Sequence, residues 1–195
     1  MITLHTKDLK DNEARKLLSG SVAPRPIAFI TTLQDNGKVN AAPFSWFNMV
    51  SGTPPLVSVS IRYDSETQKD TSRNIIKNKE FVVHIISEDY LEKANATSIS
   101  LSRLESELEY VGLTEVKSTS IKTPGIKEAK VRFECEYVTH IELESTDLII
   151  GKIVTFHIDD TVYMDGKINI KALNPVLRLP GKRYSLVGKI IEIKD

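Results

Sequence analysis

Four histidines and one cysteine are the side chains from which metal or nucleophilic chemistry would most readily be built. They are His5, His84, His140, His157 and Cys135. The histidines show no HxH or HxxxH spacing, and a single cysteine makes neither an internal disulfide nor a zinc site alone. His84 and His157 stand inside apolar strand-like runs, so we expect them, like Cys135, to be satisfied residues of the fold.

The motifs of common enzyme classes are also missing. The chain has no G-x-S-x-G elbow, no Walker loop and no G-x-G-x-x-G fingerprint. The hydrolase, NTPase and Rossmann interpretations therefore have no sequence support. We expect any site to be built from strand and turn backbone.

The segment KDTSRN, residues 69–74, has the composition of an anion-binding helix start. Asp70 or Thr71 could cap the helix and leave backbone N–H groups pointing outward at the positive end of its dipole. Further donors would come from Lys69, Ser72, Arg73 and, if it turns the same way, Arg62. The alternative is an ordinary capped surface helix with solvated charges, and the residues alone favour that alternative.

The segment NAAPFSWFN, residues 40–48, mixes polar residues into an apolar run. Ala41 and Ala42 would permit close approach of a flat ligand, and Pro43 removes a backbone donor. Ser45 and nearby backbone groups could read the edge of a heterocycle. The aromatic residues are expected either to wall such a ligand or to form core or subunit interface, and they are Phe44, Trp46 and Phe47.

Strand signals dominate both ends of the chain. Runs at 26–33 and 56–61 are β-branched and apolar, and Asn36-Gly37 between them predicts a hairpin, so the opening reads as a β-meander. Residues 149–158 form a further strand, and Asp165-Gly166 predicts a tight turn within 163–170, which makes antiparallel neighbours the expectation.

A long strand is expected at 131–144, where apolar and polar residues alternate, and its length predicts that it bends or crosses between sides of a barrel. The apolar face would carry Val131, Phe133, Cys135, Tyr137, Ile141 and Leu143, and the wet face Arg132, Glu134, Glu136, His140, Glu142 and Glu144.

Helices are expected at 69–78, at 88–98 and at 102–113, where Leu104, Leu108 and Val111 recur at helical spacing and Gly112 is a stop signal. A mainly β body with flanking helices fits this order better than βαβ units.

Composition bounds the function classes. The 195 residues carry 26 basic and 26 acidic side chains, a formal net charge of zero. We expect one domain over 1–195 and neither nucleic-acid nor membrane binding by bulk charge. No apolar run is long enough to span a bilayer and the first residues lack a signal peptide's apolar core, so the cytoplasm is the expected location.

Several motifs together resemble one family. APRPIAFITT, NGKVNAAPFSWFN, KDTSRNI, FVVHI, NATS, ELEYVGL and VRFECEYV stand in the order and spacing of the flavin reductase-like proteins. The similarity runs from about residue 20 to 185. It implies the FMN-binding split β-barrel, an antiparallel Greek-key-type fold. It further implies a homodimer that binds one FMN per subunit non-covalently near the interface.

The resemblance also assigns residues. The isoalloxazine side would be lined by Arg25, Pro26, Asn40, Ala41, Ala42, Pro43 and Ser45. The ribityl chain and phosphate would be held by Ser60, Arg62, Lys69, Asp70, Thr71 and Asn74. Asn95 and Ser98 of NATS would lie at the pocket mouth.

One departure from the family pattern stands near the C-terminus, where RLPGKRY at 178–184 replaces the usual R-L-G-G-x-x-Y. Pro180 removes a backbone N–H and fixes φ, so a ligand contact that needs that amide is lost. Gly181 and Tyr184 are retained.

The leading function is an NAD(P)H-dependent flavin reductase that passes electrons through FMN to an unidentified acceptor. The cofactor would carry the chemistry, so no side chain is named as catalytic, although Arg25 could stabilise charge on the reduced flavin. The alternative is a flavoredoxin-like electron carrier reduced by a protein partner. A barrel without flavin is disfavoured because both halves of the site keep their polar groups.

Overall fold

The computed structural model describes residues 1–65, 67–99, 101–102 and 105–193. One seven-stranded antiparallel sheet forms the body, with the strand order β3-β2-β6-β9-β10-β5-β4. Its strands are β2 (Ala28–Leu33), β3 (Val39–Phe44), β4 (Phe47–Gly52), β5 (Pro55–Arg62), β6 (Glu80–Ile85), β9 (Val131–Leu143) and β10 (Thr146–Ile158). This mainly β architecture with flanking helices confirms the predicted fold class.

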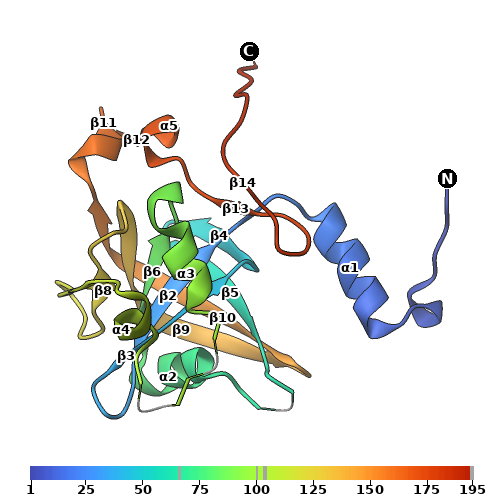
Figure 1. Cartoon of the computed structure of the whole chain (residues 1–195), viewed down its shortest axis with the longest axis horizontal. Helices are drawn as coiled ribbons and strands as arrows, with labels where there is room; N and C mark the ends of the chain where they lie inside the picture. The colour runs from blue at the N-terminus through green and yellow to red at the C-terminus, as the bar shows by residue number, and fades with distance from the viewer. Residues whose placement is uncertain (66, 100, 103–104, 194–195) are drawn as a thin grey trace.

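Small sheets and short helices decorate the body (Figure 1). The short strands are β1 (Arg25–Pro26), β7 (Glu115–Val116), β8 (Gly125–Ile126), β11 (Tyr163–Met164), β12 (Lys167–Ile168), β13 (Leu177–Arg178) and β14 (Tyr184–Ser185). The helices are α1 (Asp11–Ser21), α2 (Asp70–Asn78), α3 (Leu91–Ala96), α4 (Glu107–Val111) and α5 (Ile170–Leu173). The 3-10 turns are η1 (Thr6–Asp8), η2 (Glu88–Tyr90) and η3 (Asp160–Val162).

Strand β2 is buried on both faces, in two separate hydrophobic clusters. Ala28 and Ile30 point into an inner cluster that draws on β3, β5, β6, β9 and β10. Phe29, between them, packs in a second cluster with Tyr90, Ala94 and Leu108 on the outside. Successive side chains of a strand point to opposite faces, so the outer cluster lies under α3 and α4 while the inner one fills the barrel.

Close backbone approach fixes one glycine inside the barrel. At Gly151, where the β9–β10 register shifts, an added Cβ would lie 2.3 Å from Cζ of Phe81. The Phe81 side chain is fully buried. The sheet therefore curls tightly at this point only because residue 151 has no side chain.

The predicted turns are confirmed, but the predicted meander is wrong. Asn36-Gly37 connects β2 to β3, and Asp165-Gly166 connects β11 to β12. The chain then leaves β3 at Ser45-Trp46, and β4 pairs with β5 at the other end of the strand order. The first predicted strand is also divided, because β1 pairs with β13 rather than with the main sheet. Local turn and strand signals do not encode these distant pairings.

The long strand β9 is confirmed, and it pairs with β6 along its first part and with β10 along its whole length. Its predicted faces are partly wrong. Glu134 is fully buried, whereas Ile141 and Leu143 are exposed. Register shifts between β9 and β10 change which side chains face inward, as bulges do. The buried carboxylate of Glu134 is stabilised by donors from another loop, since it accepts from Thr119 and Ser120 N–H at 2.6 Å each.

The predicted helices at 69–78 and 88–98 are confirmed as α2 and as η2 followed by α3. Of the helix predicted at 102–113, the structure shows α4, which is followed by Gly112 in the left-handed conformation. Leu104 lies outside the described residues. The predicted cap of α2 is wrong. Lys69 occupies the N-cap position without a side-chain cap, because Asp70 pairs with Arg73 and the Thr71 hydroxyl accepts from Asn40.

Cys135 and His84 are fully buried, as predicted. His84 Nδ1 bonds the Phe29 carbonyl at 2.9 Å, and its Nε2 accepts from Ile126 N–H at 3.0 Å. Burial lowers the pKa of His84 to about 3, opposed by the bond to Phe29 and assisted by Arg132. His157 is half-buried and bonds Glu134 at 2.5 Å.

Candidate functional site

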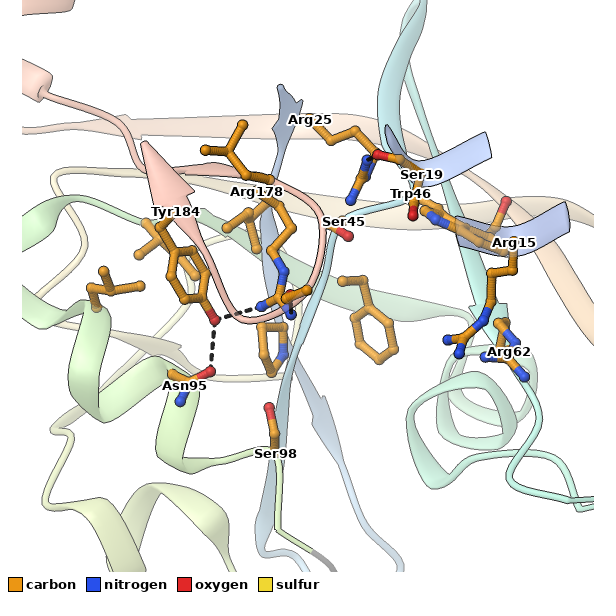
Figure 2. A pocket seen from close by; sticks show the side chains of 18 of the residues that line it. Arg15, Ser19, Arg25, Ser45, Trp46, Arg62, Asn95, Ser98, Arg178 and Tyr184 are labelled. Atoms are coloured by element: carbon orange, nitrogen blue, oxygen red, sulfur yellow. Dashed lines mark hydrogen bonds between the residues drawn. The ribbon is translucent and has the colours of Figure 1, made fainter. Parts of the chain in front are cut away.

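A hollow of about 520 Å³ opens between α1, the turn after β3, β5, α3 and the hairpin formed by β13 and β14 (Figure 2). We call it the main pocket. Its lining residues are Arg15, Lys16, Ser19, Arg25, Ile27, Pro43, Phe44, Ser45, Trp46, Ser60, Arg62, Lys69, Ile86, Leu91, Asn95, Ser98, Arg178, Leu179, Gly181 and Tyr184.

The main pocket is strongly cationic although the chain has no net charge. Arginine and lysine side chains reach it from α1, β1, β5, the start of α2 and β13, and no aspartate or glutamate is among its described lining residues. In Figure 2 the guanidinium groups of Arg15 and Arg62 point to the same side of the hollow. Clustered cations without acidic partners attract an anionic ligand.

Arg25 joins the barrel to α1. Its side chain is only 9% exposed, and its Nη1 donates to the carbonyl oxygens of Ser19 at 2.7 Å and Val22 at 2.5 Å. These carbonyls end the helix and have no partner within it, so a guanidinium is a favourable cap there. Nε of Arg25 is buried with no hydrogen-bond partner in the described part of the chain. Arg25 thus fixes the helix that carries Arg15 and keeps one donor unused beside the pocket.

The opposite wall is a chain of polar contacts between the C-terminal hairpin and α3. Arg178 Nη1 donates to the Tyr184 hydroxyl at 2.5 Å, and that hydroxyl donates to Oδ1 of Asn95 at 2.6 Å (Figure 2). Arg178 also lies over the Tyr184 ring, 4.8 Å from its centroid, and bonds the Gly181 carbonyl at 2.6 Å. The guanidinium therefore holds the turn and the tyrosine in one arrangement.

The Pro180 departure leaves this turn intact. Gly181 has φ of 72°, so the left-handed residue of the turn lies after the proline. The Pro180 carbonyl accepts from Arg183 Nε at 3.1 Å. The turn therefore needs neither an amide nor a glycine at 180.

The floor between these walls is mixed. Ile27, Phe44 and Ile86 supply apolar surface, and Trp46 lies at the rim with 36% of its surface exposed. Ser45 and Ser60 supply hydroxyls. The two segments that carry them are joined by a backbone hydrogen bond from Ser60 N–H to the Trp46 carbonyl. Such a floor suits a flat ligand with a polar edge.

The structure brings part of the predicted site together. The predicted residues that line the main pocket are Arg25, Pro43, Ser45, Ser60, Arg62, Lys69, Asn95 and Ser98. The predicted residues outside its lining are Pro26, Asn40, Ala41, Ala42, Asp70, Thr71 and Asn74. Flavin contacts of both groups stay predictions.

Several residues of the second group form a buried network behind the pocket. Asn40 Nδ2 donates to the hydroxyls of Thr32 at 3.2 Å and Thr71 at 3.0 Å, and Asn74 Nδ2 donates to Thr32 at 3.1 Å. These bonds fix α2, and with it Lys69, against β2 and β3. The polar residues at the start of 40–48 are therefore satisfied by protein groups.

Ala41 belongs to the same layer. Its N–H donates to Oε2 of the buried Glu107 at 3.0 Å, and burial raises the pKa of that carboxyl although the backbone bonds oppose the shift. This amide is therefore already engaged.

A sequence profile described as "Flavin reductase like domain" matches residues 20–171, which is most of the chain. The chain belongs to the flavin reductase like domain family. It is thus a flavin-related oxidoreductase. Among the described residues, no helix is both long and apolar enough to cross a membrane.

Relatives of this family member span its whole length. It is 46% identical to the uncharacterized protein YwrF of Bacillus subtilis, covering 97% of this chain and 96% of that one. It is 40% identical to nitrilotriacetate monooxygenase component B from Bacillus cereus, with a TM-score of 0.97 over 99% of this chain and 98% of that one. The 2-nitrobenzoate 2-nitroreductase NbaA of Pseudomonas fluorescens is 28% identical, with a TM-score of 0.91 and 100% and 96% coverage.

Sequence reasoning did not assign to the site five polar residues of the main pocket, namely Arg15, Lys16, Ser19, Arg178 and Tyr184. Three lie on α1, which was not predicted. The one available signal is Glu13, whose carboxylate accepts from Lys10 N–H at 3.0 Å as half of a capping box. A lysine at the N-cap position makes that signal weak.

Proposed function

We propose that the protein binds FMN in the main pocket and reduces it with NADPH or NADH, passing the electrons to a further acceptor. The observation that carries the proposal is the cationic lining of a pocket that has no acidic lining residue among those described. An anionic, flat cofactor suits that lining, and family membership makes the cofactor a flavin.

The residues present fit FMN in size and in chemistry. A volume of about 520 Å³ lies within the roughly 300–1,000 Å³ typical of small-molecule sites. Arg15, Arg62 and Lys69 would hold the phosphate, because guanidinium groups match phosphate oxygens in pairs. The unused Nε donor of Arg25 and the hydroxyl of Ser45 would meet polar edges of the ring system.

FMN, when bound, supplies the capacity to accept a hydride and to release electrons. The protein supplies position and charge. Arg25, which has a buried and unpaired donor, favours negative charge near the ring. Trp46 and Phe44 exclude water on one side, and the Arg178–Tyr184–Asn95 contacts hold the facing wall.

The test uses purified protein mixed with FMN and freed of excess by gel filtration. Retained yellow colour is titrated anaerobically with NADPH and, separately, with NADH, with free FMN plus each nucleotide as the control. Bleaching by either nucleotide supports the proposal, as does turnover of added FMN when none is retained. Colour reduced only by a protein reductant or dithionite would instead make the protein an electron carrier. If the protein neither retains FMN nor turns over added FMN, the proposal is contradicted.

We also propose a homodimer, which the family resemblance implies. Met49 and Val50 of strand β4, at one end of the sheet, are 71% and 54% exposed, as is usual for apolar residues that a second subunit covers. Light scattering of the eluted protein should give twice the 21.9 kDa chain mass. A monomer at micromolar concentration would contradict this proposal without affecting the pocket.

A further inference from the structure

A second hollow, of about 390 Å³, lies where β9 begins and β10 ends. Its lining is Lys127, Ala129, Lys130, Arg132, Phe156, His157, Ile158 and Asp159, and we call it the β9–β10 hollow. It shares no described lining residue with the main pocket. A ligand there would therefore be independent of FMN.

Arg132 lies at the centre of this region because of its place in the sheet. It is paired across the strands with His84 on β6 and with His157 on β10. Its side chain passes over Gly125, where an added Cβ would lie 2.9 Å from Cδ of Arg132. The Arg132 side chain thus fits against β8 only because residue 125 is glycine; a residue with a side chain there would overlap it.

Nε of the Arg132 guanidinium has no hydrogen-bond partner in the described part of the chain. This nitrogen is buried, although the side chain lines the hollow. Burial lowers the pKa of the group, and the nearby Glu134 opposes that shift. A buried guanidinium nitrogen without a partner is costly, and an anionic ligand that contacts the part of the guanidinium facing the hollow would offset this cost.

The carboxylates near Arg132 are engaged elsewhere. Glu134 accepts from two backbone N–H groups and from His157, and Asp89 bonds Lys130 Nζ at 2.6 Å. Asp159 is the one acidic lining residue described, and its Oδ1 accepts from Thr161 N–H at 2.9 Å. Lys127 is exposed at the rim.

We propose that the β9–β10 hollow binds a small oxyanion group, a phosphate or a carboxylate, with Arg132 as its main ligand and Lys127 as a second cation. The fork of an arginine pairs with two oxygens of either group. Asp159 limits the affinity by repulsion at one side of the hollow.

The experiment is a ¹H–¹⁵N NMR titration that observes the Nε–H signal of Arg132, assigned by its loss in Arg132→Lys. Inorganic phosphate and malonate are the two probes, and NaCl at matched ionic strength is the control. We expect the signal to shift saturably with one or both probes, with half-saturation on the order of 1 mM. Which probe binds more tightly distinguishes a phosphate from a carboxylate ligand.

Variants separate this site from the main pocket. Arg132→Lys keeps the charge but loses the fork, so the shift of the Ile126 and Lys127 amides should need about tenfold more probe. Asp159→Asn keeps the acceptor for Thr161 and removes the repulsion, so binding should tighten roughly fivefold. Lys152→Gln, an exposed charge on β10 outside the hollow, and Arg62→Gln should leave the titration unchanged.

The proposal would be overturned if the shift rose linearly with probe concentration without saturating, or if NaCl reproduced it. It would also be overturned if Arg132→Lys left the titration of the Ile126 and Lys127 amides unaltered. Arg62→Gln abolishing the shift would also overturn it, because the probe would then be acting through the main pocket.

Discussion

The hydroxyl of Tyr184 donates to Oδ1 of Asn95 at 2.6 Å, across 89 positions of sequence. This bond ties the C-terminal hairpin to α3 and completes one wall of the main pocket. Arg178 supports it from behind by donating to the same hydroxyl. The Tyr184 hydroxyl thus links the hairpin to α3 by accepting a hydrogen bond from Arg178 and donating one to Asn95.

Tyr184→Phe removes that oxygen and leaves the ring in place. We expect FMN affinity to fall by about threefold to tenfold, since a hydrogen bond of about 1 kcal/mol no longer orders the wall. Fluorescence titration with FMN measures the change. Tyr110→Phe is the matched control, because Tyr110 is 66% exposed and lies outside the pocket. Equal affinities of the two variants would show that the bond does not order the site.

Arg62→Gln tests the phosphate end of the pocket. Loss of a charge-assisted bond should weaken FMN binding by about tenfold or more, while riboflavin, which lacks the phosphate, should bind nearly as before. Arg15→Gln should act in the same direction, and this would show that α1 takes part. Competition between the two flavins measures both effects. If both variants weakened riboflavin as strongly as FMN, the phosphate would lie elsewhere.

Gly151→Ala tests the packing of the barrel. The added methyl would overlap the buried Phe81 ring, so we expect the free energy of unfolding to fall by about 2 kcal/mol. Gly52→Ala, at the end of β4, meets no atom within 4 Å and should change stability little. Urea denaturation compares the two. Similar stabilities for both variants would mean that the barrel relaxes around residue 151.

His84 predicts a pH dependence of stability. Burial lowers its pKa to about 3 in the folded protein, from the ordinary histidine value of 6.5. The unfolded chain therefore takes up a proton first, and stability falls as pH drops below about 6.5, by up to about 1.4 kcal/mol per pH unit.

His84→Asn should be less stable at pH 7, where it loses the bond from Ile126, but its stability should depend less on pH between 6.5 and 4. Urea denaturation at each pH gives the two slopes. Parallel slopes for the wild type and the variant would contradict the buried, neutral histidine.

Local signals in the sequence predict most strands of the main sheet and the helix α2, but they predict neither α1 nor the pairing of the strands. Asn36-Gly37 predicts its hairpin because glycine adopts positive φ without strain, and Gly37 has φ of 80° in this turn. The predicted faces of β9 fail at Ile141 and Leu143 because the register shift between Ile150 and Gly151 leaves one extra residue on β9, and a bulge is not visible in residue types. The alternation of residues predicts Glu134 in solvent. Its burial could not be predicted, because its donors, Thr119 and Ser120, come from a loop with no strand signal.

The site shows the same division. The family resemblance identifies Arg25, Arg62 and Lys69, which line the pocket. Arg15 precedes the region of resemblance, and Arg178, the first residue of RLPGKRY, was not assigned to the site. They reach the pocket through α1 and the C-terminal hairpin. Asn40 and Asn74 stay predicted flavin contacts, and in the structure their side chains also bond the Thr32 hydroxyl. No local sequence pattern announces such a buried network.

The central claim, that FMN occupies the main pocket, has a built-in reporter. Trp46 is the single tryptophan of the chain, and it lies at the rim of this pocket. Its fluorescence should be quenched saturably by FMN, with one FMN bound per chain, and Arg62→Gln should shift the quenching curve to about tenfold higher FMN. Quenching that does not saturate, or that Arg62→Gln and Arg15→Gln both leave unchanged, would contradict the assignment of this pocket to FMN.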